Sequence, residues 1–301
     1  MEPTNIAGDV IRDHTATKPS AEVLKSFRFS PMPGGNNPKC RAEADDGRTY
    51  VVKWSKNNLS RVPEINRREM LISILGRLVG VGVVDAWVVR SEFLPEYAFP
   101  PDEPQVPLIR DECVVMPFLQ GSTVAQSKPA SAIRVAWNAS AIADLFAFMH
   151  WIGDEDRGVD DVMLIDDRFV LIDNGLCGPG APESGLRGYH PNWEDFRHNS
   201  EAKVKKCYPG KPSFVAFVLR DLALPMDFIP LPSAIDRIMT ITDEAIREIA
   251  THCRVASSVS GELIHRKAHL AIEYREWFSQ ALALPCIRNP YRSSRAPRLI
   301  L

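Results

Sequence analysis

The sequence predicts an α+β protein of two parts, in which a smaller strand-rich part precedes a larger helical part. Short apolar runs bounded by turn residues occupy 27–54 and recur at 83–89 and 113–119. Beyond residue 121, longer segments with apolar residues at helical spacing dominate. An acidic stretch at 153–175 interrupts the helical part with two more short apolar runs, which are typical of buried strands.

Composition limits the class of protein. The chain has 301 residues, of which 45% are hydrophobic and 25% charged, so it can bury the core of one large domain or two. Its formal net charge of -2 gives no support to nucleic-acid or membrane-surface binding. No apolar run approaches the roughly 20 residues that a membrane span needs, and residues 1–20 lack a signal peptide's apolar segment. The six cysteines show no C-x-x-C spacing, so we expect reduced thiols in a cytoplasmic protein.

We expect four regions along the chain. They are a flexible N-terminal segment (1–20), a smaller strand-rich part (21–121), a larger helical part (122–285) and a basic C-terminal tail (286–301). The tail contains Arg288, Arg292, Arg295 and Arg298, and is interpreted as a solvated end rather than a partner-binding arm.

The first part opens with strands. A strand is predicted at 27–32, and two strands joined by a tight turn at 45–47 are predicted within 39–54. Side chains alternate between the two faces of a strand, so Lys53 shares a face with Val51. The other face holds three large apolar residues, Tyr50, Val52 and Trp54.

The remaining elements follow in order. A helix at 64–80 carries apolar residues at helical spacing, and strands follow at 83–89 and 113–119, separated by a proline-rich irregular segment at 94–109. Further helices are predicted at 130–152, 214–222, 233–254 and 262–282.

The helix at 64–80 contains two glutamates. A helical wheel places Glu69 beside the small residues Ser73 and Gly76, away from the stripe of bulky leucines, and Glu64 lies nearer that stripe. Because the small residues let the Glu69 side face a cleft, Glu69 is kept as the candidate site residue and Glu64 is its competitor.

The acidic stretch predicts a metal site. Two apolar runs flank Asp166 and Asp167, which makes a β-hairpin at 161–172 with Asp161 and Asp173 at its outer ends. Two carboxylates held a few ångströms apart repel by about 4 kcal/mol at an effective dielectric of 20, so such a pair needs a cation or a proton. Oxygen ligands favour magnesium or manganese.

Ordinary turn chemistry accounts for part of this charge. Asp166 and Asp167 are interpreted as turn residues at the hairpin tip. A calcium loop is excluded, because Gly158 comes one position too early after Asp154 and Ile165 stands where the bidentate glutamate is needed. Asp156, in the loop entering the hairpin, is a candidate base or orienting group beside the metals.

These segments carry a family resemblance. The sequence “DRGVDD” followed by “LIDNGL” resembles the catalytic and metal-binding segments of the HipA-like and type II phosphatidylinositol 4-kinase-like family of atypical kinases. Upstream, “GRTYVVKW” is similar to the third strand with its nucleotide lysine, “NRREMLISILGRLVGV” to the helix with its glutamate, and “VVMPFLQGS” to the hinge. The late segment “RKAHLAIEYREWF” is similar to the closing helix, so the resemblance covers roughly residues 25–282.

The resemblance implies a bilobal protein-kinase-like fold that uses ATP and magnesium, or manganese. Residues 21–121 would form the nucleotide-binding N-lobe, and residues 122–285 the C-lobe with the catalytic loop. It implies that Lys53 contacts the nucleotide phosphates and pairs with Glu69, and that Asp156 orients or accepts the proton of the attacking hydroxyl. Asp161 and Asp173 would hold the metal ions. Nucleotide-binding positions are also assigned in the glycine-bearing loop and the hinge, namely Gly34, Gly35, Met116 and Phe118.

Two departures from the family pattern bear on function. Asp161 stands where the family has asparagine, which adds negative charge and strengthens the need for metal. The loop at 32–39 matches no standard phosphate motif, so an ordinary turn stays an equal alternative for Gly34 and Gly35.

Three functions follow from these features. The leading hypothesis is an ATP- and magnesium-dependent protein serine/threonine kinase. The alternatives are a phosphoinositide kinase, which the “DRG” and “IDNG” segments favour, and a nucleotide-binding pseudokinase with a scaffold or regulatory role, which Asp161 favours. Fold alone does not choose among them, and transfer of another group, such as a nucleotidyl group, also stays open.

Overall fold

A computed structural model describes residues 6–32, 39–54, 65–95, 111–127, 139–154, 157–166, 168–175 and 232–283. The described residues form two compact units. The first consists of those within 6–120, 173–175 and 241–264. The second consists of those within 121–172, 232–240 and 265–283.

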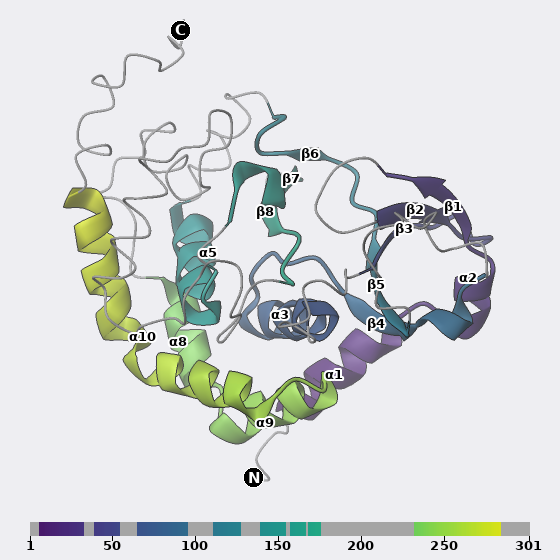
Figure 1. Ribbon diagram of the computed structural model, residues 1–301. Helices are drawn as coiled ribbons and strands as arrows, with labels where there is room; N and C mark the ends of the chain where they lie inside the picture. Colours follow the sequence, from purple (N-terminus) through teal and green to yellow (C-terminus); the bar gives the residue numbers. More distant parts are fainter. Residues whose placement is uncertain are drawn as a thin grey trace, which may run out of the picture. The chain divides into compact units, whose positions relative to one another are not determined.

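The first unit contains an antiparallel sheet with the strand order β1-β2-β3-β5-β4 (Figure 1). Its strands are β1 (Arg28–Pro31), β2 (Lys39–Glu43), β3 (Thr49–Lys53), β4 (Trp87–Arg90) and β5 (Glu112–Pro117). β5 lies between β3 and β4. In the pairing of β3 with β5, Lys53 lies opposite Val114, which is buried. The sheet therefore holds the end of β3 firmly on both sides.

The predicted turn and face alternation in the first unit are confirmed. The β2–β3 connection closes with the Ala44 amide donating to the Arg48 carbonyl at 2.9 Å, and Gly47 adopts a φ of +81° that glycine accepts without strain. One face of the sheet packs into a buried core that includes Phe27, Tyr50, Val52, Trp54 and Trp87. Lys53 therefore points away from this core, as the alternation requires.

Four helices complete the first unit, together with the first residues of α10. They are α1 (Ile6–Ala16), α2 (Ala21–Lys25), α3 (Ile65–Val79) and α9 (Asp243–His252). α3 contacts β4, β5, α1 and α9, and its apolar residues Leu71, Ile72, Ile74 and Leu75 are buried. Since α3 is packed on several sides, its orientation is fixed by the unit as a whole.

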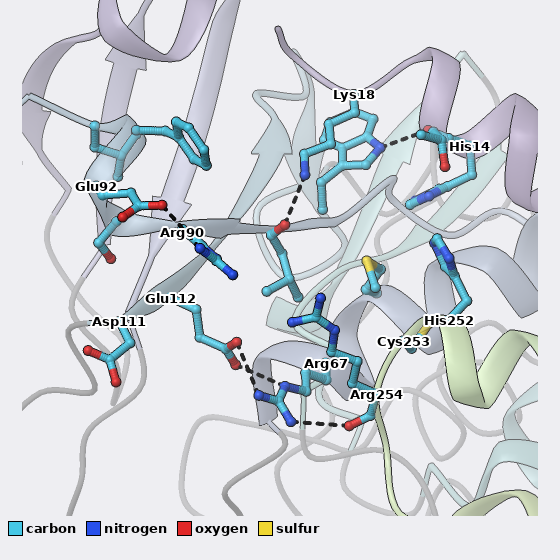
Figure 2. Close-up of a pocket in the computed structure, with 17 residues that line it drawn as sticks. His14, Lys18, Arg67, Arg90, Glu92, Asp111, Glu112, His252, Cys253 and Arg254 are labelled. Carbon is cyan, nitrogen blue, oxygen red and sulfur yellow. Dashed lines mark hydrogen bonds and ion pairs between the residues drawn. The ribbon is translucent and has the colours of Figure 1, made fainter. Parts of the chain in front are cut away.

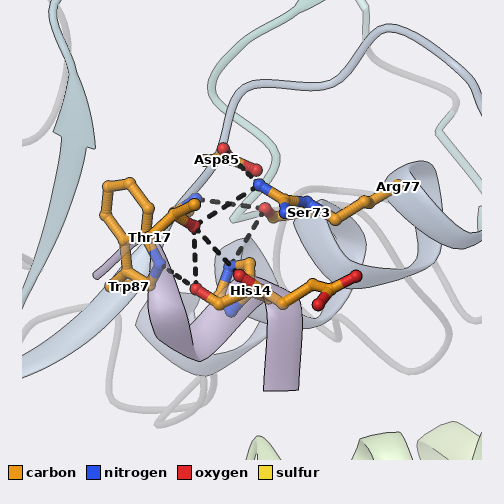
Figure 3. Close-up of polar contacts among 8 residues, drawn as sticks. His14, Thr17, Ser73, Arg77, Asp85 and Trp87 are labelled. Atoms are coloured by element: carbon orange, nitrogen blue, oxygen red, sulfur yellow. Dashed lines mark hydrogen bonds and ion pairs between the residues drawn. The ribbon is translucent and has the colours of Figure 1, made fainter. Parts of the chain in front are cut away.

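The N-terminal segment contains the first helix of the chain. Residues 6–16 form α1, in which Ala7 and His14 are buried. Figure 3 shows how this helix is attached: the indole nitrogen of Trp87 donates to the His14 carbonyl at 3.0 Å, and the His14 ring nitrogen lies 3.5 Å from the Ser73 hydroxyl. The partners come from α3 and β4, about 60 to 70 residues away in sequence, so the local pattern gave no sign of them.

Two element boundaries also differ from the predictions. The helix predicted at 233–254 is two helices, α8 (Ser233–Thr240) and α9, because the Thr242 hydroxyl accepts a hydrogen bond from the Ala245 amide at 3.1 Å and caps the second helix. The strand predicted at 83–89 begins only at Trp87. Before it, Asp85 pairs with Arg77 at 2.6 Å, which ties this stretch to α3 instead of to the sheet.

The second unit contains a small antiparallel sheet and helices. Its strands are β6 (Ser122–Thr123), β7 (Val162–Ile165) and β8 (Arg168–Leu171), in the order β6-β7-β8. The predicted hairpin is confirmed, with Ile165 opposite Arg168 and a positive φ of 46° at Asp166 in its turn. The helices are α5 (Ala139–Ile152), the short 3-10 helix η4 (Val159–Asp161), α8 and the later part of α10 (Ser257–Ala283).

The α+β class predicted from the sequence is confirmed by these two antiparallel sheets and the separate helices. Among the described helices, none combines the length and the apolarity that crossing a membrane requires. Several predicted features lie outside the described residues: Gly34 and Gly35, most of the irregular segment at 94–109, the helix at 214–222 and the tail at 286–301. The cysteines Cys40, Cys113 and Cys253 are buried free thiols.

The buried histidine of α1 makes stability depend on pH. Burial lowers the pKa of the His14 imidazole to about 4, below its usual 6.5, so His14 is neutral in the native protein at pH 7. Below pH 6.5 the unfolded chain takes up a proton that the native chain does not, and stability falls as the pH drops towards 4. We expect His14 to account for a loss of about 2 kcal/mol between pH 7 and pH 5.

Urea unfolding at both pH values measures this loss. His14→Gln should reduce the loss of unfolding free energy between pH 7 and pH 5 by about 2 kcal/mol, although it lowers stability at pH 7. The control His265→Gln, at an exposed position in α10, should retain it. An unchanged pH dependence in His14→Gln would contradict the assignment.

Candidate active site

A buried lysine with two carboxylate partners is the main feature of the first unit. The Lys53 ammonium, at the end of β3, lies 3.5 Å from Oε2 of Glu69 in α3 and forms an ion pair with Asp173. The Glu69 side chain is 0% exposed and that of Lys53 6%, whereas that of Asp173 is 52% exposed. The structure therefore brings the predicted pair of Lys53 and Glu69 together with Asp173, which was predicted as a metal ligand, and Asp173 is the carboxylate that reaches solvent.

The charge balance keeps Lys53 protonated. Burial alone lowers the pKa of an ammonium group, but the nearby carboxylates of Glu69 and Asp173 outweigh that effect and raise the pKa of Lys53 above its ordinary value. The contribution of this shift to stability is present below the unfolded-state pKa of 10.5 and is lost only at higher pH. Lys53 is thus a fixed cation throughout the physiological range.

Glu69 has a second partner that the sequence interpretation did not identify. Its Oε1 accepts a hydrogen bond from the backbone amide of Asn174 at 2.8 Å, and Asn174 is 0% exposed. One carboxylate therefore connects the end of β3, the middle of α3 and the segment that follows β8. No sequence signal points to a main-chain amide as a partner, because any residue except proline supplies one.

The segment 173–175 approaches α3 closely. A Cβ atom placed on Gly175 would lie 2.6 Å from Cγ2 of Ile65 and 2.9 Å from Oε2 of Glu69, both far inside normal contact distance. Glycine is therefore required at position 175 so that the backbone can lie against the helix. This gives a physical reason for the glycine of the “IDNG” segment.

Asp173 adopts an unusual backbone conformation. Its φ is 57°, in the left-handed region that residues other than glycine rarely enter, although aspartate and asparagine tolerate it best. Strained residues of this kind gather at functional sites, where the surrounding structure enforces them. Because the Asp173 side chain is half-exposed, it is also the member of the cluster that a dissolved ion can reach.

In the second unit, a buried arginine organises the loop that enters the hairpin. Nε of Arg157 donates to Oδ2 of Asp154 at 2.7 Å, and its Nη1 donates to the carbonyls of Asp161, at 3.2 Å, and Ile172. Arg157 is only 4% exposed. It therefore links the loop to both outer ends of the hairpin. Neither Arg157 nor Asp154 was predicted as a site residue, although both belong to the acidic stretch.

Asp161 stands at the predicted place in the second unit. Its carbonyl accepts from the Ile172 amide at 3.0 Å, so the backbone ends of the hairpin meet one residue before Asp173. Its Oδ2 accepts from the Gly158 amide at 3.0 Å, which positions the carboxylate at the end of η4. Asp156 lies outside the described residues, as does Glu64.

The predicted hinge residues lie at the end of β5. Met116 pairs with Val51 across the sheet and is 8% exposed. The Phe118 amide donates to the Thr49 carbonyl at 2.9 Å, and the guanidinium of Arg41 lies 4.9 Å from the centre of the Phe118 ring. The Phe118 amide is therefore already used by the sheet, and a contact of this residue with a nucleotide would come from its ring or carbonyl.

Carboxylate oxygens are the available ligands for a metal ion. Within the described ranges, no group of three or more His, Cys, Asp or Glu residues could hold one. Asp173 in the first unit and Asp161 in the second are hard oxygen donors that suit magnesium or manganese. Each of these carboxylates, taken by itself, has the chemistry of a magnesium ligand, since magnesium is usually bound through one or two carboxylates plus phosphates and water.

No protein-family model matches the chain, and no curated protein matches it either. Among solved structures, the chain is similar to CtkA, a proinflammatory kinase of Helicobacter pylori, with 10% identity, a TM-score of 0.44 and coverage of 87% of this chain and 98% of that one.

Two other kinases show a comparable likeness. The Golgi casein kinase with Mn and ADP bound has 12% identity and a TM-score of 0.45, with coverage of 96% of this chain and 77% of that one. The amicoumacin kinase hAmiN, in complex with AMP-PNP and Ca²⁺, has 11% identity and a TM-score of 0.34, with coverage of 88% and 93%. At such identities and scores, the function of this chain is inferred from its own side chains.

The buried ion pair should show strong energetic coupling. Glu69→Gln leaves Lys53 with one carboxylate fewer, and Lys53→Met leaves Glu69 and Asp173 without their cation, so each change should destabilise the protein by about 2 to 4 kcal/mol. The double variant Lys53→Met/Glu69→Gln removes both charges, while the glutamine can still accept from the Asn174 amide. We expect it to be more stable than either single variant by at least about 1 kcal/mol.

Denaturant unfolding of the four proteins provides the complete double-mutant cycle. The exposed pair Arg28 and Asp45, 3.1 Å apart, serves as the control and should show coupling below about 1 kcal/mol. Additive effects at Lys53 and Glu69 would show that the two groups do not stabilise each other.

Gly175 should not tolerate a side chain. We expect Gly175→Ala to destabilise the protein by about 1 to 3 kcal/mol, because its Cβ must displace Ile65 or Glu69. The matched control is Gly261→Ala in α10, where a Cβ meets nothing within 4 Å. That change should stabilise the helix by up to about 1 kcal/mol. Thermal unfolding of both variants tests the contrast, and equal effects would contradict it.

Proposed function

We propose that the chain is an ATP- and magnesium-dependent phosphotransferase, and that it acts on the hydroxyl groups of protein serine or threonine residues. The supporting observation is the buried Lys53 ammonium, which is anchored by Glu69 inside the first unit and paired with the half-exposed Asp173. A lysine at the end of the third strand with a glutamate from the following helix is the pairing that kinases use to hold nucleotide phosphates.

The two carboxylates around Lys53 have different tasks in this proposal. Glu69 is wholly buried and already bonded to Asn174, so it serves as the fixed anchor of Lys53. Asp173 can exchange its contact with Lys53 for a metal ion, because half of its side chain is open to solvent. Lys53 then has a donor available for a phosphate oxygen.

The remaining roles come from the second unit. Asp161 is proposed as the second metal ligand, held by the Gly158 amide, and Asp156 as the group that orients or accepts the proton of the attacking hydroxyl. Arg157, the residue after Asp156 in the sequence, donates to the carbonyls at the two ends of the hairpin. Bound magnesium would supply the positive charge that neutralises the phosphate oxygens.

The acceptor class rests on the resemblance to HipA-like kinases. The “DRG” and “IDNG” segments equally suit type II lipid kinases, and Asp161 in place of asparagine suits a protein that binds nucleotide without turnover. These alternatives make different experimental predictions, so one set of assays separates them.

Transfer of labelled phosphate from ATP tests the proposal. With magnesium present, the wild-type protein should phosphorylate itself or a generic protein substrate. Lys53→Met, Asp156→Ala and Asp173→Ala should each reduce the rate by at least about 100-fold, since each removes a group that binds nucleotide, metal or the attacking hydroxyl. Asp46→Ala, which removes an exposed carboxylate from the β2–β3 turn, is the control and should retain full activity.

The other outcomes are equally informative. Wild-type activity in Asp173→Ala would refute the assignment of this site. Thermal stabilisation by ATP and magnesium without transfer would identify a pseudokinase. Transfer only to phosphoinositide vesicles, and not to protein, would identify a lipid kinase.

A further inference from the structure

A second site lies in the first unit, away from Lys53. It is a pocket of about 980 Å³ whose walls come from the ends of α1 and α9, from α3, and from the β4 and β5 strands (Figure 2). None of Lys53, Glu69 and Asp173 lines it. Its size is that of ordinary ligand pockets, which hold a small organic molecule.

One side of the pocket gathers positive charge without negative partners. Lys18, at the end of α1, donates to the Val88 carbonyl at 3.2 Å. Among the described residues, neither Lys18 nor Arg254 has a carboxylate within ion-pair distance. His252 lies on the same side of the pocket (Figure 2). Its pKa is lowered by burial and further by the positive charges of Lys18 and Arg254, so His252 is the neutral member of the three.

The acidic side chains of the pocket do not cancel this charge. Glu112 is paired with Arg67 at 3.3 Å, and Glu92 with Arg90 at 3.3 Å. The remaining acid, Asp111, lies across the pocket from Lys18 in Figure 2. The unpaired positive charge is therefore concentrated at one end.

Arg254 adopts a backbone conformation that is unfavourable for a residue with a side chain. Its φ is 56°, at the position after α9 where glycine is the usual residue. A residue with a Cβ atom costs about 1 kcal/mol there. The Arg254 carbonyl accepts from Arg67 at 3.2 Å, but any residue supplies a carbonyl, so this bond does not explain the arginine.

Apolar residues also line the pocket. Met70, Trp87 and Leu94 line the pocket, and Phe93 at its rim is 37% exposed, which is unusual for a phenylalanine. An aromatic or aliphatic group of a ligand would cover this apolar surface, and the removal of both surfaces from water would stabilise the complex.

We propose that this pocket binds a phosphate ester with an apolar body, whose phosphate is held by Lys18, His252 and Arg254 while its apolar part packs on Met70, Trp87 and Phe93. The two permanent cations, Lys18 and Arg254, match the charge of a phosphate monoester, which is about -1.5 to -2 at pH 7, and the neutral His252 imidazole adds a hydrogen-bond donor. The binding does not depend on phosphotransfer at Lys53.

Titration with 1-naphthyl phosphate in metal-free buffer tests the proposal. The wild-type protein should bind one probe molecule saturably, and more tightly than inorganic phosphate. Lys18→Gln and Arg254→Gly should each raise the Kd about tenfold or more, since each removes one charge-assisted hydrogen bond. Arg254→Gly should also raise the melting temperature, because it relieves the positive φ, so weaker binding in this variant cannot be attributed to misfolding.

Two control variants define where the probe binds. Lys53→Met, which alters the proposed nucleotide site, should bind the probe with a Kd within about twofold of the wild-type value, as should Lys25→Gln, which removes a cation of α2 outside the pocket. Absence of saturable binding would overturn the proposal. So would loss of binding in Lys53→Met together with normal binding in Arg254→Gly. Equal affinity for inorganic phosphate would refute the role of the apolar surface.

Discussion

The buried carboxylate of Glu69 is the interaction on which the first unit depends. It lies between the Lys53 ammonium and the Asn174 amide, and none of its surface reaches water. Removing a carboxylate from water is costly, so such a group is retained only where a cation and hydrogen-bond donors compensate it. Here the cation comes from β3 and the hydrogen-bond donor from residues 173–175, which are more than 100 positions apart in the sequence. Glu69 therefore fixes the position of residues 173–175 relative to β3.

This constraint explains the residues around it. Gly175 must lack a side chain because Glu69 and Ile65 occupy the space beside its backbone. Asp173 takes a left-handed conformation two residues earlier, and its carboxylate turns to Lys53. The short “IDNG” segment is thus shaped by its contact with α3 as much as by any ligand.

The sequence was sufficient for features with a regular local pattern. The alternation of side chains along β3 placed Lys53 on the other face of the strand from Tyr50 and Trp54. The helical wheel placed Glu69 on the side of α3 away from the leucine stripe. The hairpin of β7 and β8 followed from two apolar runs around a pair of aspartates.

Features that depend on distant partners were missed for a common reason. The place of α1 is set by Trp87 and Ser73, which its own sequence does not reveal. In the sequence, Arg157 is indistinguishable from an exposed arginine, because its partners are the backbone carbonyls of Asp161 and Ile172. Main-chain partners of this kind leave no trace in residue identity.

α3 is the element that both sites share. Glu69 faces Lys53, while Arg67 and Met70, two positions before and one after, line the second pocket. Successive residues of a helix point about 100° apart, so one rigid helix can present different faces to the two sites. A ligand in the second pocket could influence Lys53 only if it changed the position of α3, because none of the residues that line the pocket belongs to the Lys53 cluster. Tight packing of α3 against β4, β5, α1 and α9 opposes such a shift, and the two sites are therefore expected to bind their ligands independently.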